Sequence, residues 1–134
     1  MAADEPDVSP FSGLLGLEWL KQEPDDTQAR LTVRKELTQP YGYLHGGVFS
    51  AVADELCSRS TVIQVIMDGR VALGQTVEMS LLRSVREGTV TFKGRARHRG
   101  MTSWVWDVEA IDDRDRLCAL GRVTVAVRTF ERPD

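Results

Sequence analysis

One long apolar segment, residues 46–67, most constrains how this 134-residue chain can fold. It is the one strong helix candidate, and its apolar side chains are those of Val48, Phe49, Val52, Leu56, Ile63 and Ile66. They occupy most of the helix circumference, which indicates burial on several sides. Ala51 and Ala53 add helix propensity, and Asp68-Gly69 forms a stop signal. The rest of the chain must supply the elements that cover this helix.

Four strand candidates follow, with no second helix between them. They cover residues 71–82, 89–98, 103–111 and 117–127. The third alternates clearly, because Trp104, Trp106, Val108 and Ala110 fall on one face. Two further strands are expected before the helix, at residues 17–21 and 29–33, after a short helical turn over 11–15 that closes at Gly16. Polar residues, glycines and a proline supply the turns.

This order of elements predicts an α+β fold, with one helix set against an antiparallel sheet. A long buried helix wrapped by a curved antiparallel sheet is the hotdog architecture. We expect a single domain over residues 10–130, preceded by a flexible arm at residues 1–9 that is rich in proline and acidic residues. Because one helix cannot cover both faces of the sheet, we also expect dimerisation or higher assembly.

The charge and the cysteines narrow the classes of partner. A sequence pI near 5.4 argues against a nucleic-acid partner. The acidic N-terminus does not resemble a secretory signal, and no apolar run reaches the ~18 residues of a membrane span. We therefore expect a soluble, cytoplasmic protein. Cys57 and Cys118 suit buried apolar positions, and Asp54 near Cys57 would raise its thiol pKa and disfavour reactivity.

The loop at residues 39–47 leads directly into the helix and suggests chemistry at its start. Gly46 and Gly47 stand where backbone N–H groups lack intrahelical acceptors and the helix dipole is positive. Without a β-carbon, they let a carbonyl oxygen approach closely, as an oxyanion site requires. The simpler alternative is that two glycines only allow the loop to turn into the helix.

Asp54 is a carboxylate inside this apolar helix and needs a partner or a role. Ser58 lies four residues later on the same face and can hydrogen-bond it. A carboxylate held there can act as a nucleophile on an acyl carbon or as a general base on water. The alternatives are a solvated charge or a partner for Arg59 or for an arginine of the sheet. The adjacent Glu55 leaves open which of the two acids faces solvent.

The spacing of the two features has a consequence for assembly. Gly46 and Asp54 are eight residues apart, which corresponds to ~12 Å along a helix. Both cannot reach one carbonyl from the same chain. If they cooperate, each must come from a different subunit, and the site must lie in a dimer interface.

Other chemistries have less support in the sequence. The only histidines are His45 and His98, and their spacing does not resemble a metal-ligand set. The chain has no G-x-S-x-G elbow, Walker loop or dinucleotide-binding fingerprint. We therefore expect neither a metal nor an organic cofactor. His45 borders the glycines and can order the loop, whereas His98 falls at a strand end and is expected to be structural or solvent-facing.

Roughly residues 11–128, and most densely residues 39–58, resemble the hotdog-fold acyl-CoA thioesterases. This group includes the phenylacetate-pathway, 4-hydroxybenzoyl-CoA and 1,4-dihydroxy-2-naphthoyl-CoA enzymes. The matching pattern is a glutamine or asparagine, then Gly-x-x-His-Gly-Gly, then an acid on the helix; further likeness occurs at residues 82–88, 98–100 and 115–117. The resemblance implies a role for each of these residues. Gln39 would orient the water or the thioester, and His45 would position the carbonyl that the Gly46 N–H polarises. Asp54 would act from the opposing subunit as nucleophile or general base, and Ser58 would hold the water or the carboxylate.

The resemblance also suggests contacts to the substrate and to CoA, through Gly47, Arg83 and Arg99. A basic cluster is expected there, comprising Arg83, Arg86, Arg95, Arg97 and Arg99, with a charged sheet edge as its simpler explanation. The chain departs from the family in three respects. First, the acid at position 54 is Asp where naphthoyl-type members have Glu, and residue 39 is Gln where the phenylacetate type has Asn, so the chain mixes two subtypes. Second, Leu81 stands where naphthoyl-type members have histidine. Third, Met101 stands where a basic residue is common.

The expected function is hydrolysis of an acyl- or aroyl-CoA thioester, or of an acyl carrier protein thioester, to a free acid and a thiol. The resemblance implies a homodimer that pairs into a homotetramer. From the charge and the hydropathy of the chain we expect no nucleic-acid or membrane partner. Two alternatives remain: a non-catalytic hotdog protein that binds acyl-CoA or regulates a pathway, and a hydratase-type hotdog enzyme, whose paired Asp and His motif is not apparent here.

Overall fold

The structure is a computed structural model, and it describes residues 9–130. The helical elements are α1 (Pro10–Leu15), η1 (Lys35–Leu37), α2 (Gly46–Val65) and η2 (Ile66–Asp68). The strands are β1 (Glu18–Gln22), β2 (Asp26–Thr32), β3 (Arg70–Leu81), β4 (Thr89–Arg99), β5 (Ser103–Asp112) and β6 (Leu117–Thr129). The arm expected at residues 1–9 lies outside the described residues except for Ser9, which caps α1 by accepting a hydrogen bond from the Ser12 N–H.

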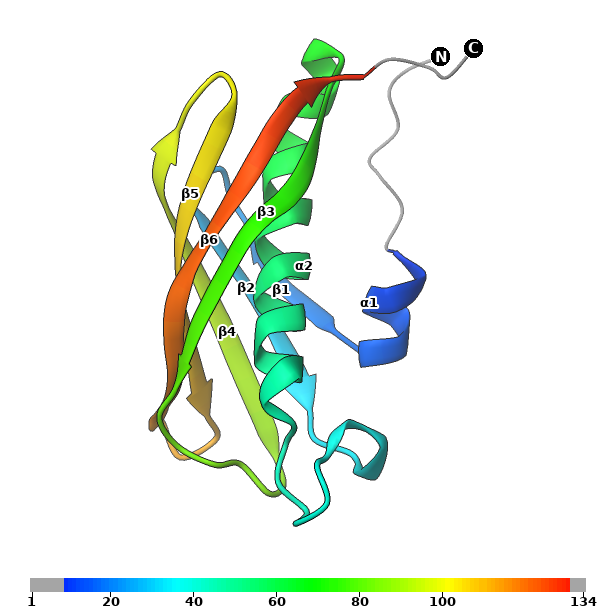
Figure 1. The fold of residues 1–134 in the computed structure, drawn as a ribbon, viewed down its shortest axis with the longest axis vertical. Coiled ribbons are helices and arrows are strands. Elements are labelled where there is room, and N and C mark those ends of the chain that lie inside the picture. The colour runs from blue at the N-terminus through cyan, green and yellow to red at the C-terminus, as the bar shows by residue number, and fades with distance from the viewer. Residues whose placement is uncertain (1–8, 131–134) are drawn as a thin grey trace.

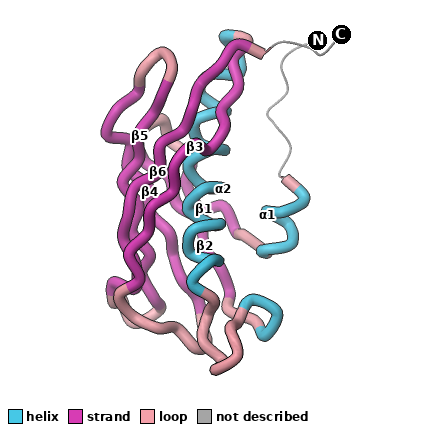
Figure 2. Tube along the Cα trace, in the orientation of Figure 1, coloured by secondary structure: helices cyan, strands magenta, loops and turns pink. Residues whose placement is uncertain are grey.

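All six strands form one sheet in the order β1-β2-β4-β5-β6-β3, and each neighbouring pair is antiparallel. The sheet curves around α2, which runs along its concave side, while α1 lies beyond the helix on the side away from the sheet (Figure 1). Figure 2 shows the same division into one long helix and a surrounding sheet. The predicted α+β hotdog fold is confirmed.

The core lies between α2 and the concave face of the sheet. Alternate residues of β5 point into it, as predicted, and Trp106 is completely buried. Phe49 of α2 packs against Phe92 of β4, with ring centroids 5.9 Å apart. The Trp106 indole N–H donates to the Thr61 hydroxyl at 2.9 Å, so its buried polar atom is satisfied. The packing therefore fixes both the position and the rotation of α2.

The boundaries of two elements differ from the sequence expectation. The α-helix ends at Val65, and a 3₁₀ turn continues to Asp68 before Gly69 adopts a left-handed φ of 72°. Strand β2 starts at Asp26, three residues before the expected start at residue 29. The Lys21 ammonium contacts the Asp26 carboxylate at 2.6 Å, and Asp26 pairs with Arg95 of β4. Pairing with neighbouring strands thus overrides the local turn preference.

Strand β3 forms one edge of the sheet and lies against α2. It is 12 residues long, and most of its residues are exposed, including Leu73 and Leu81. A long edge strand leaves unpaired backbone N–H and C=O groups available to a second strand. Among the described residues, none of the helices is long and apolar enough to cross a membrane.

Candidate active site

The loop before α2 is held by the side chain of Gln39. Its amide oxygen accepts hydrogen bonds from the backbone N–H groups of Tyr41 at 2.5 Å and Tyr43 at 3.2 Å. Gly42, with a φ of 88°, makes the tight turn between them. Because the oxygen is used within the loop, the NH2 group is the part of Gln39 that can donate to a bound molecule.

His45 is the N-cap of α2. Its Nδ1 atom accepts a hydrogen bond from the Gly47 N–H at 2.9 Å, and this leaves Nε2 to carry the proton of the neutral ring. The Gly46 N–H takes part in none of the hydrogen bonds that the structure shows among residues 9–130. Of the two glycines, Gly46 therefore presents the free donor at the positive end of the helix dipole.

A pocket of about 260 Å³ opens beside Gly46. It is lined by Gln39, Tyr43, Leu44, Gly46, Phe49, Leu81, Leu82, Arg83 and Ser84. Leu81, at the end of β3, lies so close that a β-carbon on Gly46 would be 2.6 Å from its Cδ1 atom. We call this the thioester pocket, because an N–H donor, an amide donor and apolar walls meet there, as a carbonyl with an apolar substituent requires.

Asp54 lies farther along α2 and faces β3. Its Oδ1 atom accepts a hydrogen bond from the Ser58 hydroxyl at 2.9 Å, as the i, i+4 spacing predicted. The carboxylate occupies the space that a side chain would fill at Gly74 of β3, since a β-carbon there would be 2.0 Å from Oδ1. The neighbouring Glu55 points elsewhere and accepts a hydrogen bond from Ser9 before α1 at 2.8 Å. Both acids are half-buried, so neither is simply a solvated charge.

Within one chain, the two halves of the motif meet β3 at different places. Gly46 lies against Leu81, whereas Asp54 lies against Gly74, seven residues earlier on the strand. Seven residues of an extended strand span about 20 Å or more. The thioester pocket and the Asp54 carboxylate of one chain are therefore apart, as the spacing of Gly46 and Asp54 along the helix also requires.

The structure separates the arginines that the sequence grouped together. Arg83 lines the thioester pocket, but Arg99 lies at the far end of β4, with its guanidinium 6.0 Å from the centre of the Trp104 ring. Arg97 pairs with Asp107 at 3.5 Å, and Arg95 lines a separate hollow on the sheet. The length of β4 keeps Arg99 away from Arg83, whereas Arg95 and Arg97 both lie near Asp107.

Comparison with known proteins identifies the family. The model of the thioesterase superfamily matches residues 41–119, more than half of the chain. This chain belongs to the thioesterase superfamily. A curated relative, 1,4-dihydroxy-2-naphthoyl-CoA hydrolase of Listeria monocytogenes serotype 1/2a, is 30% identical over 114 residues, which cover 85% of this chain and 92% of that protein. The chain is a thioester hydrolase.

Solved structures of thioesterases share its fold. Thioesterase PA1618 of Pseudomonas aeruginosa, solved as a glutamine-to-alanine variant, has a TM-score of 0.86 and 28% identity over 93% of this chain and 96% of that one. SAV0944 of Staphylococcus aureus, solved once with a glutamine and once with a glutamate replaced by alanine, also has TM-scores of 0.86. Its identity to this thioesterase is 26% and 27% in the two structures, and each covers 90% of this chain and 99% of that one.

The sequence did not indicate that two further residues of this thioesterase shape the site. Gly74 makes room for the Asp54 carboxylate, and Leu81 covers the N-terminus of α2. A glycine inside a strand is a signal for close approach by another group, and this signal was present at Gly74. Leu81 was noted only as a departure from the family, and its contact with Gly46 depends on how β3 crosses the helix.

Cys57 and His98 do not line the thioester pocket. Cys57 is fully buried, and burial, with a smaller contribution from the Asp54 carboxylate, raises the pKa of its thiol well above the ordinary value. A thiol of this kind is a poor nucleophile at neutral pH. His98 is exposed near the end of β4, away from the thioester pocket.

Proposed function

We propose that this thioesterase hydrolyses an acyl- or aroyl-CoA to the free acid and CoA, at sites that two subunits share. One observation supports the proposal: the free N–H of Gly46 and the half-buried carboxylate of Asp54 lie at separate places along β3. A second copy that supplies Asp54 to the thioester pocket of the first would complete the site.

The residues have distinct roles in this mechanism. The thioester carbonyl accepts from the Gly46 N–H, with the Gln39 NH2 group beside it, and His45 and Gly47 hold the helix start in place. Asp54 removes a proton from water, and the resulting hydroxide oxygen bonds to the carbonyl carbon. The C–S bond then breaks, and the thiolate leaves and takes a proton. In an alternative for the same residue, the Asp54 carboxylate itself attacks and water later hydrolyses the anhydride.

Ser58 and the arginines support these steps. The Ser58 hydroxyl fixes the Asp54 carboxylate by donating to it. Arg83 lines the thioester pocket and can approach an anionic part of the substrate from the same chain. Arg99 lies too far along β4 to do so, and can contribute only from another subunit.

The relatives support both the chemistry and the positions. The name of the Listeria monocytogenes relative specifies a CoA thioester. In SAV0944, the glutamine and the glutamate that were replaced by alanine lie 15 positions apart, and Gln39 and Asp54 have the same separation. This match favours Gln39 and Asp54 as the corresponding pair in this chain.

The edge strand supports a dimer. Strand β3 carries Gly74 and Leu81, so pairing of β3 with β3 of a second copy would bring the two halves of the motif together across the interface. The exposed Leu73 on the same strand gives such an interface apolar contact area. We propose a homodimer as the catalytic unit, and two such dimers as a homotetramer.

Replacement of the acid tests the proposed function. We expect Asp54→Asn to lower kcat for acyl-CoA hydrolysis by about a thousandfold, because the amide cannot accept a proton from water. The measurement is thiol release from a panel of aromatic, short-chain and long-chain CoA thioesters. Glu55→Gln is the matched control, since it removes the adjacent carboxylate, and it should retain wild-type rates. Unchanged hydrolysis by Asp54→Asn would exclude Asp54 as the catalytic acid.

A further inference from the structure

Strand β3 contains a β-bulge near the middle of its length. Gly74 pairs with Val125 of β6. The next paired residue is Thr76, which lies opposite Thr124, so Gln75 is an extra residue with no partner on β6. A bulge of this kind changes which face the following side chains point to, and bulges are common next to functional sites. The position of Gln75 therefore bears on the geometry of the site.

The bulge puts both halves of the motif on the helix side of β3. Gly74 faces α2, because the Asp54 carboxylate occupies the space of its side chain. Leu81 also faces α2 and lies against Gly46. Residues seven positions apart in a regular strand point to opposite faces, since side chains alternate. The single extra residue, Gln75, removes this mismatch, so that one strand can cover both Gly46 and Asp54.

The bulge also determines where Gln75 lies in the proposed dimer. Opposed residues of an antiparallel pair share a face, so Gly74 of one chain can lie opposite Leu81 of a second copy. This pairing brings Asp54 of the first chain to Gly46 of the second, as the shared site requires. Gln75 then lies beside Leu81 of the second copy, next to both the Asp54 carboxylate of its own chain and the thioester pocket of the other.

The polar side chain of Gln75 is available for a bound molecule. It is exposed, and its amide takes part in none of the hydrogen bonds that the structure shows among residues 9–130. Other polar groups of the site are already engaged. The Gln39 amide oxygen accepts within its own loop, and the Ser58 hydroxyl donates to Asp54. Gln75 therefore offers both a free donor and a free acceptor next to the site.

We propose that Gln75 orients the attacking water in the shared site. The inference rests on the proposed function, because the water lies between Asp54 of the same chain and the thioester carbonyl at Gly46 of the second copy. The water gives one proton to Asp54 and directs a lone pair at the carbonyl carbon. Its other O–H group needs an acceptor, and the Gln75 amide oxygen supplies it. The water is then held in the orientation for attack, which lowers the entropy cost of the reaction.

Gln75→Leu tests this role, since leucine is similar in size but has no amide. We expect kcat for acyl-CoA hydrolysis to fall about tenfold with KM nearly unchanged, because the substrate still binds but the water is not oriented. The measurement is thiol release over a range of substrate concentrations. Gln28→Leu is the matched control: it makes the same change on β2, at a separate hollow of the sheet, and it should keep wild-type kinetics. Unchanged kcat, or a loss in KM alone, would overturn the proposal.

Mixed dimers test on which side of the site Gln75 acts. In the proposal it acts with Asp54 of its own chain and with Gln39 of the other. Gln75→Leu refolded with an equal amount of Gln39→Ala should therefore regain about a quarter of the wild-type activity, since one site of each mixed dimer is intact. The same mixture with Asp54→Asn should stay near about a twentieth, because each site of the mixed dimer carries one defect.

The two mixtures distinguish an effect at the site from a general loss of structure. Equal activity of both mixtures would overturn the role of Gln75, because a weakened fold does not depend on which subunit carries the second defect. A silent Gln75→Leu variant would leave the proposed function standing. Full activity of Gln39→Ala and of Asp54→Asn alone would instead contradict the proposed function.

Discussion

At the scale of single residues, the site depends on space as much as on reactive groups. Asp54 fits against β3 because Gly74 has no side chain, and Leu81 packs against the start of α2 because Gly46 has none. These two glycines differ from those that make turns, since neither has a positive φ. Their role is to allow close approach rather than an unusual backbone conformation.

Replacement of Gly74 tests this role. The added methyl group of Gly74→Ala would lie 2.0 Å from Asp54 Oδ1, so the carboxylate must move. We expect kcat to fall about ten- to a hundredfold, because a misplaced catalytic group loses its alignment with the substrate. Gly13→Ala is the control, since nothing lies within 4 Å of the new β-carbon, and thioester hydrolysis should be unchanged. A Gly74→Ala enzyme with wild-type kcat would contradict the assignment.

At the scale of secondary-structure elements, the start of α2 is fixed by an unusual N-cap. Histidine at this position accepts from the Gly47 N–H through Nδ1. We expect His45→Ala to lower the free energy of unfolding by about 1 kcal/mol, measured by urea denaturation, and His45→Asn to restore most of it through its side-chain oxygen. Equal stability of the Ala variant and the wild-type protein would show that the cap contributes nothing.

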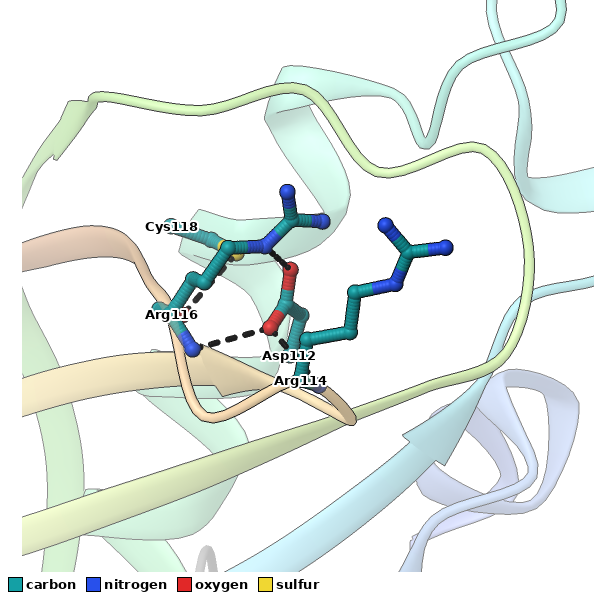
Figure 3. Close-up of polar contacts among 4 residues, drawn as sticks. All are labelled: Asp112, Arg114, Arg116 and Cys118. Atoms are coloured by element: carbon teal, nitrogen blue, oxygen red, sulfur yellow. Dashed lines mark hydrogen bonds and ion pairs between the residues drawn. The ribbon is translucent and has the colours of Figure 1, made fainter.

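The β5–β6 hairpin gives a prediction about acid stability. Burial alone would raise the pKa of the Asp112 carboxyl, but the three hydrogen bonds from Arg116 and Arg114 outweigh it and hold the pKa below its usual value (Figure 3). Because the pKa of this carboxyl is lower in the folded state, the ionised group stabilises the fold at any pH above its pKa in the unfolded chain. This stabilisation is lost as the pH falls through its pKa in the folded protein. Asp112→Asn should therefore have a lower Tm than the wild type at pH 7.

The difference between the two proteins should shrink as the pH falls below about 4, where the wild-type carboxyl becomes protonated. Thermal unfolding of both proteins at several pH values measures it. Asp113→Asn is a suitable comparison, because Asp113 accepts none of these three hydrogen bonds. A difference in Tm that stays constant from pH 7 to pH 3 would contradict the role given to the Asp112 carboxylate.

At the scale of the whole molecule, the shared site predicts complementation between inactive subunits. Gln39→Ala removes the donor of the thioester pocket, and Asp54→Asn removes the acid. In a mixed dimer, one of the two sites combines both defects and the other is intact. Random mixing in equal amounts should therefore restore about a quarter of the wild-type activity.

The subunits are unfolded together and refolded before thioester hydrolysis is measured, because stable dimers exchange slowly. Each variant refolded alone is the control and should stay nearly inactive. If the mixture has only the summed activity of the two variants, Gln39 and Asp54 act within one chain and the shared site is wrong.

Much of the fold could be read from the sequence because its signals were local. The apolar circumference of residues 46–67 predicted a buried helix, and the alternation at Trp104 and Trp106 predicted the buried face of β5. The hydrogen bond from Ser58 to Asp54 followed from helical spacing alone. The start of β2 could not be predicted, because its pairing with β4 involves residues far away in the chain.

The site was predictable to a lesser degree. The sequence identified Gln39, Gly46 and Asp54 as candidates, but it grouped Arg99 with Arg83, and the length of β4 separates them. The hydrogen bonds from the Leu82 and Arg83 N–H groups to the Cys118 carbonyl had no local signal, because the β3–β4 loop and β6 lie far apart in the chain. Contacts between segments far apart in the chain can be predicted only when the strand order is known.

The order of residues along the chain was enough to predict a single long apolar helix, an antiparallel sheet and a polar motif at the helix start. Periodicity and chain spacing are properties of neighbouring residues, so these features needed no tertiary information. The groups that face the motif became known from the folded structure. The crossing of β3 over α2 places Leu81 at Gly46 and Gly74 at Asp54, because these contacts depend on the register between a strand and a helix rather than on either element alone.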